Sequence, residues 1–151
     1  MKVLFLHGLN SNPGGSKAQA LLNAGYDVFN PALDVPFKIA VEIAQNVINS
    51  EKPQVIVGSS RGGAVAMAVD AKGAKRVLIA PAWKKYGVPC RAESAIVLHS
   101  KTDNIILFKD TEMLLEKNPN LKLIICDDNH RMKKEETLQK IVECVNNCAN
   151  K

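Results

Sequence analysis

The sequence predicts an α/β fold: a three-layer, doubly wound and mostly parallel sheet of about six strands. Short apolar runs recur along the chain, and they lack the alternation that is typical of a half-exposed strand. Continuous apolar runs are typical of parallel strands covered on both faces. Helical patterns separate the runs, and this alternation favours a parallel sheet with helices on both sides.

Six segments are expected to form the strands. Five of them are strongly apolar, whereas the segment 27–30 is weaker and is expected at an edge of the sheet. In chain order the expected strands are residues 3–6, 27–30, 55–57, 77–80, 95–98 and 121–126.

Helices are expected between these strands. After Pro36, apolar residues repeat every four positions at Ile39, Ile43 and Val47, which indicates an amphipathic helix. Residues 64–69 are apolar on all sides, which indicates a helix buried at the centre of the fold. Further helices are expected near residues 16–24, 108–117 and 133–149.

Length and composition exclude several classes of protein. With 151 residues, 46% of them hydrophobic, the chain suits one globular domain over residues 1–151. The net charge of +5 is a mild bias toward anionic partners. Nucleic-acid binding is not expected, because the basic residues between 72 and 91 accompany no base-reading motif.

The same composition bears on the expected cellular compartment. No apolar stretch is long enough for a signal peptide or a membrane span, so a cytoplasmic protein is expected. The four cysteines are then expected to be reduced, mostly buried thiols.

Polar residues with catalytic potential follow three of the expected strands. Ser60, Asp103 and His130 each come just after a different strand. In a parallel sheet, ligands bind outside the carboxyl ends of the strands. We therefore expect these three side chains to lie at one edge of the sheet.

The segment around Ser60 matches the pattern G-x-S-x-G, with Gly58 before the serine and Gly62 after it. It follows an apolar strand and opens a buried helix, which is the context of a nucleophile elbow. The turn is sharp, so the positions two before and two after the serine must be nearly free of side chains. The amide of Arg61, at the helix N-terminus, is expected to help stabilise an oxyanion.

A serine hydroxyl needs a neighbouring base to take its proton, and a histidine suits that role. His130 is the expected base, with Asp103 as the carboxylate that orients it. His7 and His99 are expected to be structural. Two further acids, Asp127 and Asp128, precede His130, and one of them is an alternative partner for the base.

With these motifs the chain resembles a small, lidless member of the α/β-hydrolase superfamily, similar to compact bacterial esterases. The motifs are Leu6–Ser11 after the first strand, the Gly58–Gly62 elbow, His99–Asp103 and Asn129–His130. The resemblance implies that the Leu9 amide is the second oxyanion donor. It also implies a lid insertion at residues 82–94, which are too few for one, so an open, shallow site is expected.

Three further residues lie near the expected site. Arg61 stands where the family often has an apolar residue or histidine, and it is expected either to be solvated or to attract a substrate carboxylate. Asn10 and Trp83 are candidate substrate-lining residues, although core or surface packing is an equal alternative for Trp83.

The function that the sequence favours is a serine hydrolase for small carboxylic or thio esters, with Ser60, His130 and Asp103 as a catalytic triad and without metal or cofactor. The alternative is a flavodoxin-like phosphate- or nucleotide-binding module without catalysis, in which the loops 10–16 and 58–63 cradle phosphate. That alternative lacks a G-x-G-x-x-G turn and a Walker lysine, and it leaves the order of Asp103 and His130 unexplained.

Overall fold

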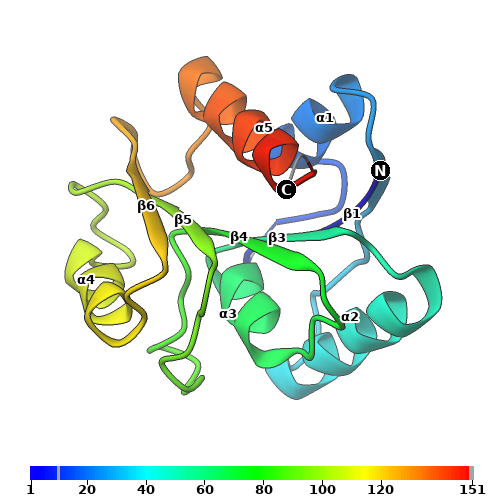
Figure 1. Ribbon diagram of the computed structural model, residues 1–151, viewed down its shortest axis with the longest axis horizontal. Coiled ribbons are helices and arrows are strands. Elements are labelled where there is room, and N and C mark those ends of the chain that lie inside the picture. Colours follow the sequence, from blue (N-terminus) through cyan, green and yellow to red (C-terminus); the bar gives the residue numbers. More distant parts are fainter. Residues whose placement is uncertain (10, 150–151) are drawn as a thin grey trace.

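The computed structural model describes residues 1–9 and 11–149, and it contains one six-stranded sheet with the order β2-β1-β3-β4-β5-β6 (Figure 1). All neighbouring strands pair in parallel, so the predicted fold class is confirmed. The strands are β1 (Lys2–Leu6), β2 (Asp27–Phe29), β3 (Val55–Ser59), β4 (Lys75–Ile79), β5 (Ile96–His99) and β6 (Lys122–Ile125).

Helices cover both faces of the sheet (Figure 1). One face carries α1 (Ser16–Asn23) and α5 (Glu135–Ala149), which lie against each other. The other face carries α2 (Phe37–Glu51), α3 (Arg61–Ala68) and α4 (Phe108–Lys117). Within the described residues, none of these helices is long and apolar enough to cross a lipid bilayer.

Two hydrophobic cores explain why the central strands are apolar at every position. In β1, Val3 and Phe5 pack into the core beneath α1 and α5, whereas Leu4 and Leu6 pack into the core beneath α2 and α3. Successive side chains of a strand point to opposite faces, so a sheet with helices on both sides buries both sets.

The edge strands differ from the central ones. The weak strand β2 lies at one edge, as the sequence predicts. Strand β6 lies at the other edge, and the expectation that its apolar run is covered on both faces is wrong. Leu123 and Ile124 are only half-buried, and Ile125 is 47% exposed, because β6 is the outermost strand and no strand of the described chain pairs with its outer side.

The order of the strands determines where a site can form. The chain runs from β1 outward to β2 and then returns past β1 to β3, so the direction of the connections changes between β1 and β3. In doubly wound sheets, ligands bind at the carboxyl ends of the strands beside such a switch point. The loop after β1 and the turn after β3 meet there.

Candidate active site

Ser60 occupies a strained turn between β3 and α3. Its backbone has φ 55° and ψ −114°, a region that residues other than glycine rarely adopt. Strain of this kind costs about 1–3 kcal/mol and persists only where the surrounding structure enforces it. Because the turn is sharp, the Ser60 side chain projects from the carboxyl edge of the sheet rather than into either core.

Two glycines make this turn possible. A Cβ added at Gly58 would lie 2.3 Å from the carbonyl oxygen of Gly62. A Cβ added at Gly62 would lie 2.0 Å from the carbonyl oxygen of Leu6 on β1. Real Cβ atoms do not approach this closely, so only glycine fits at either position. The structure thus supplies the steric reason for the G-x-S-x-G spacing.

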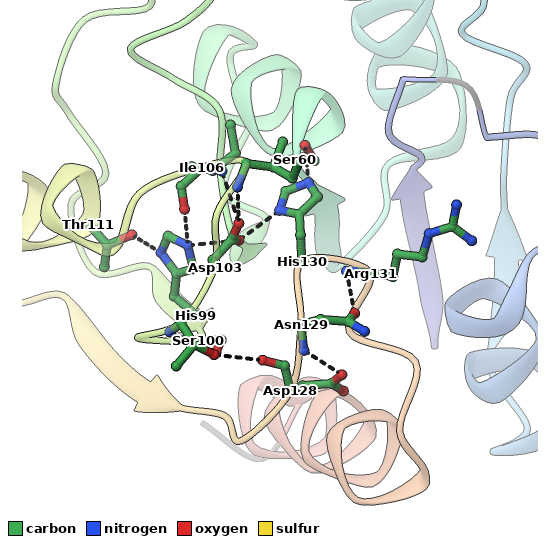
Figure 2. A network of polar contacts seen from close by, with 12 residues as sticks. Ser60, His99, Ser100, Asp103, Ile106, Thr111, Asp128, Asn129, His130 and Arg131 are labelled. Carbon is green, nitrogen blue, oxygen red and sulfur yellow. Dashed lines mark hydrogen bonds and ion pairs between the residues drawn. The ribbon is translucent and has the colours of Figure 1, made fainter.

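His130 connects Ser60 to Asp103 (Figure 2). Its Nε2 lies 3.0 Å from the Ser60 hydroxyl oxygen, and its Nδ1 lies 2.7 Å from Asp103 Oδ2. Asp103 accepts hydrogen bonds only, so Nδ1 carries the proton and Nε2 is left to accept one from Ser60. The His130 side chain is 19% exposed, which leaves it accessible from the solvent side.

Asp103 is a buried carboxylate with four hydrogen-bond donors. Oδ2 accepts from His130 and from His99, and Oδ1 accepts from the amides of Ile105 and Ile106, each at 2.9 Å. Burial alone would raise the pKa of Asp103, but these hydrogen bonds outweigh it and hold the pKa well below its usual range. The carboxylate is therefore charged and fixed in orientation.

His99 also belongs to this network, with a more specific role than the structural one expected from the sequence. It is fully buried, and its Nε2 lies 3.1 Å from Asp103 Oδ2 and 2.9 Å from the carbonyl oxygen of Ile106. Both partners are acceptors, so Nε2 is the protonated nitrogen, while Nδ1 lies 2.8 Å from the Thr111 hydroxyl. The signal was available in the sequence, since His99 precedes Asp103 by four residues at the end of a strand.

The acids that precede His130 do not contact its ring. Asp128 instead accepts hydrogen bonds from the Thr137 hydroxyl and from the amides of Lys134 and Asn129. These bonds fix the turn between β6 and α5, and with it the backbone that carries His130 (Figure 2). Of the carboxylates weighed from the sequence, Asp103 is the one that meets the imidazole.

The backbone amides of Leu9 and Arg61 are the expected oxyanion donors. In the described part of the chain neither amide donates to a backbone carbonyl, and Arg61 is the first residue of α3. The loop that carries Leu9 lies against the elbow, because a Cβ on Gly8 would be 3.5 Å from Ser60 Cβ. His7 holds that loop in place by accepting from the Leu33 amide and donating to the Gly8 carbonyl, each at 2.9 Å.

Both expectations for the Arg61 side chain are wrong. Arg61 is only 6% exposed, and its guanidinium donates to the carbonyl oxygens of Leu33, at 2.8 Å, and Val35. The rings of Phe37 and Tyr86 lie 5.8 and 5.6 Å from it. The side chain is therefore neither solvated nor available to a substrate, and it ties α3 to the segment that precedes α2.

Trp83 does not line the site either. It is 6% exposed, packs in the core beneath α2 and α3, and donates its indole N–H to the Asp110 carbonyl at 3.2 Å. The acyl-pocket interpretation of Trp83 is corrected accordingly. The other candidate lining residue, Asn10, lies outside the residues that the structure describes.

A cleft of about 620 Å³ borders Ser60 and His130. It lies between the loop that follows β1, the turn around Ala82 and Tyr86, the Ile105–Ile106 segment and the His130 loop. The segment expected to be too short for a lid forms only turns in this region. Among residues 1–9 and 11–149, no cluster of His, Cys, Asp or Glu side chains is arranged to hold a metal ion.

Solved structures share this fold at low sequence identity. The mouse alpha/beta hydrolase domain-containing protein 10 has a TM-score of 0.83 at 13% identity, over 99% of this chain and 89% of that chain. Est1E from Butyrivibrio proteoclasticus has a TM-score of 0.81 at 12% identity, over 99% and 88%.

A third structure is nearly the same length as this chain. A putative hydrolase of the alpha/beta superfamily from Xanthomonas campestris pv. campestris has a TM-score of 0.72 at 20% identity, and the match covers 99% of this chain and 98% of that one. These likenesses confirm the α/β-hydrolase fold.

Comparisons at the level of sequence identify the family. A search of curated proteins finds no match. A family model, however, matches residues 2–88, which include β1, the elbow and α3. The chain therefore belongs to the uncharacterised protein family UPF0227 and has the fold of the α/β hydrolases.

Proposed function

We propose that this protein is a serine hydrolase that cleaves small carboxylic or thio esters. The observation that carries the proposal is the pair of contacts made by His130, which lies within 3.0 Å of the Ser60 hydroxyl on one side and 2.7 Å of Asp103 on the other. A base in contact with both a hydroxyl and a buried carboxylate has the geometry needed to activate a nucleophile.

In the first step, Ser60 Oγ attacks the carbonyl carbon of the ester, and its proton passes to His130 Nε2. Asp103 stabilises the imidazolium that forms, through the hydrogen bond to Nδ1. The carbonyl oxygen becomes an oxyanion, and the amides of Leu9 and Arg61 are its proposed hydrogen-bond donors. Donors of this kind are each worth roughly 3–4 kcal/mol of barrier in other enzymes.

In the second step, the tetrahedral intermediate collapses. The bond to the alcohol or thiol breaks, and His130 returns the proton to that leaving group. An acyl group remains on Ser60 Oγ. Water then attacks the acyl carbon while His130 takes its proton, and the bond to Ser60 breaks to release the carboxylic acid.

The buried half of the network keeps the base oriented. The four donors to Asp103 fix both carboxylate oxygens, so His130 is held with Nδ1 toward the protein and Nε2 toward the cleft. In the described part of the chain, no lysine or arginine forms an ion pair with Asp103, whose charged partners are limited to His99 and His130.

The flavodoxin-like alternative is not favoured. The strand order alone does not separate the two, because flavodoxin-like sheets share the order 2-1-3-4-5. A phosphate-binding module, however, has no need of a strained serine or of the contacts that His130 makes. Two of the solved structures with this fold, those from mouse and Xanthomonas campestris, are hydrolases by name.

A fluorophosphonate probe tests the proposal. It should label the wild-type protein at Ser60, and Ser60→Ala should abolish both labelling and ester hydrolysis. Loss of the nucleophile should lower kcat by up to ~10⁶-fold, or roughly 8 kcal/mol. The neighbouring Ser59, which forms no hydrogen bond with the His130 ring among the described residues, provides the matched control, and Ser59→Ala should still be labelled. Labelling that persists in Ser60→Ala would refute the assignment.

A further inference from the structure

The cleft beside Ser60 is lined by basic side chains. Lys17, Lys85, Arg131 and Lys133 all border it, and among its described lining residues none is acidic. The formal charge of the chain is only +5 from 20 basic and 15 acidic residues, so an all-basic lining is not what the composition alone would produce.

Three of these cations form a cluster, which we call the basic cluster and define as Lys17, Arg131 and Lys133. Lys17 lies at the start of α1, and its Nζ donates to the backbone carbonyl of Arg131 at 2.6 Å. Arg131 directly follows His130, and Figure 2 shows its guanidinium extending away from Asp103. Arg131 therefore adjoins the base on the side away from the buried carboxylate, and Lys17 is hydrogen-bonded to its backbone.

Within the basic cluster, the like charges of Lys17 and Lys133 lie close enough to repel each other. Burial, reinforced by the nearby charge of Lys133, lowers the pKa of Lys17 to about 8, although Asp128 opposes the shift. Asp128 is itself held by Thr137 and two backbone amides. A bound anion would relieve the repulsion between Lys17 and Lys133.

The four cleft cations differ from several other basic residues in forming no ion pair among the described residues. Lys2, Lys72 and Lys84 form ion pairs with neighbouring carboxylates. Within the described residues, none of the four cleft cations does so. These charges are therefore not paired with a carboxylate of the described chain, and the same cleft has an apolar surface at Ile105, which is 60% exposed.

From this arrangement we propose that the natural substrate is an ester that carries a carboxylate or a phosphate, with that anion bound by the basic cluster while the ester carbonyl lies at Ser60. The inference rests on the proposed function and specifies its substrate class. The basic cluster takes the anion-binding role that the sequence suggested for Arg61. The Arg61 guanidinium instead donates to backbone carbonyls.

Matched pairs of esters test the inference. For an anion on the acyl side, 4-nitrophenyl hydrogen adipate is compared with neutral 4-nitrophenyl methyl adipate. For an anion on the alcohol side, 2-acetoxyethyl phosphate is compared with neutral 2-methoxyethyl acetate. Release of nitrophenolate or of acid gives kcat/KM for each member, and the arm with the preference identifies which part of the substrate carries the charge.

In at least one arm, kcat/KM should be roughly tenfold higher for the anionic ester at low salt, since exposed charges each contribute only modestly. The double variant with Arg131→Met and Lys133→Met should lose that preference, because its kcat/KM should fall far more for the anionic ester than for the neutral one. Lys38→Met, which removes an exposed charge from α2, should keep the preference. High salt should weaken it.

Failure of the inference is distinguishable from failure of the proposed function. Equal rates on both members of both pairs, with Ser60 still labelled by fluorophosphonate, would overturn the anion site alone. An equal loss of both rates in the double variant would do the same, since it would mean a general disturbance of the His130 loop. No labelling and no hydrolysis of any of the four esters would overturn both proposals.

Discussion

His99 and Asp103 are joined by a hydrogen bond of 3.1 Å between Nε2 and Oδ2, and that carboxylate oxygen also receives His130. The two histidines thus hold one oxygen from opposite sides, one from the cleft and one from the protein interior (Figure 2). His99 touches neither the serine nor the cleft, so any part it has in the reaction is to position Asp103.

Removing the His99 donor should therefore lower turnover more than it lowers substrate binding. His99→Leu should reduce kcat by about 10- to 100-fold with little change in KM, because a hydrogen bond to a charged group is worth about 1.5–3 kcal/mol. His99→Gln, which keeps an N–H donor, should recover most of the loss. Steady-state kinetics and thermal melting of both variants separate a positioning role from a packing role. If kcat falls equally in both variants and follows the fall in Tm, His99 acts only in packing.

Gly62 should tolerate no side chain. Gly62→Ala would bring a methyl group to 2.0 Å from the Leu6 carbonyl oxygen, so the elbow or β1 must move. We expect the free energy of unfolding to fall by about 3 kcal/mol, measured by urea titration. Gly15→Ala is the control, because its Cβ would meet nothing closer than 3.9 Å, and a similar loss there would contradict the steric explanation.

The Arg61 side chain should matter for stability and not for recognition of an anion. Arg61→Met keeps the apolar stem but leaves the Leu33 and Val35 carbonyls without their donor. The free energy of unfolding should fall by about 1–3 kcal/mol. The ratio of kcat/KM for the anionic and neutral esters should not change, and a collapse of that ratio would restore Arg61 as a substrate contact.

The preference for anionic esters should depend on pH through Lys17. Its pKa is lowered to about 8, so the ammonium is charged below that pH and loses its proton above it. The groups that set this value are burial, Lys133 and Asp128, with the Arg131 carbonyl as the hydrogen-bond partner. The rate ratio between the paired esters should fall as pH rises from 7 to about 9.5.

Lys17→Met provides the comparison for this pH dependence. Its rate ratio should be lower than that of the wild type at pH 7 and should no longer fall through pH 8. A wild-type ratio that stays constant across this range would mean that Lys17 does not contact the anion.

Most of the fold could be predicted from the sequence. The helix at 108–117 matches α4 at both ends, and each of the six predicted strands overlaps an observed one. The reason is local: a central strand between two helical layers must be apolar throughout, and that pattern is visible without coordinates. The prediction that the strand at 121–126 is covered on both faces was wrong, because an apolar sequence does not show whether its strand lies at the edge of the sheet.

The meeting of Ser60, Asp103 and His130 could also be anticipated, because position after a strand in a parallel sheet fixes the edge at which a residue emerges. The partners of individual side chains could not. Arg61 bonds carbonyls 26 and 28 residues away along the chain, and Trp83 bonds one at a separation of 27. Such pairings depend on how two segments pack in space, which no spacing in the sequence encodes.

The close approach of Gly62 to Leu6 has a consequence for the thermal unfolding of this protein. Strand β1 and the turn around Ser60 are packed directly against each other. We therefore expect that neither can unfold while the other stays folded. Thermal unfolding of the sheet and loss of hydrolase activity should then occur in the same transition. No partly unfolded form should retain activity.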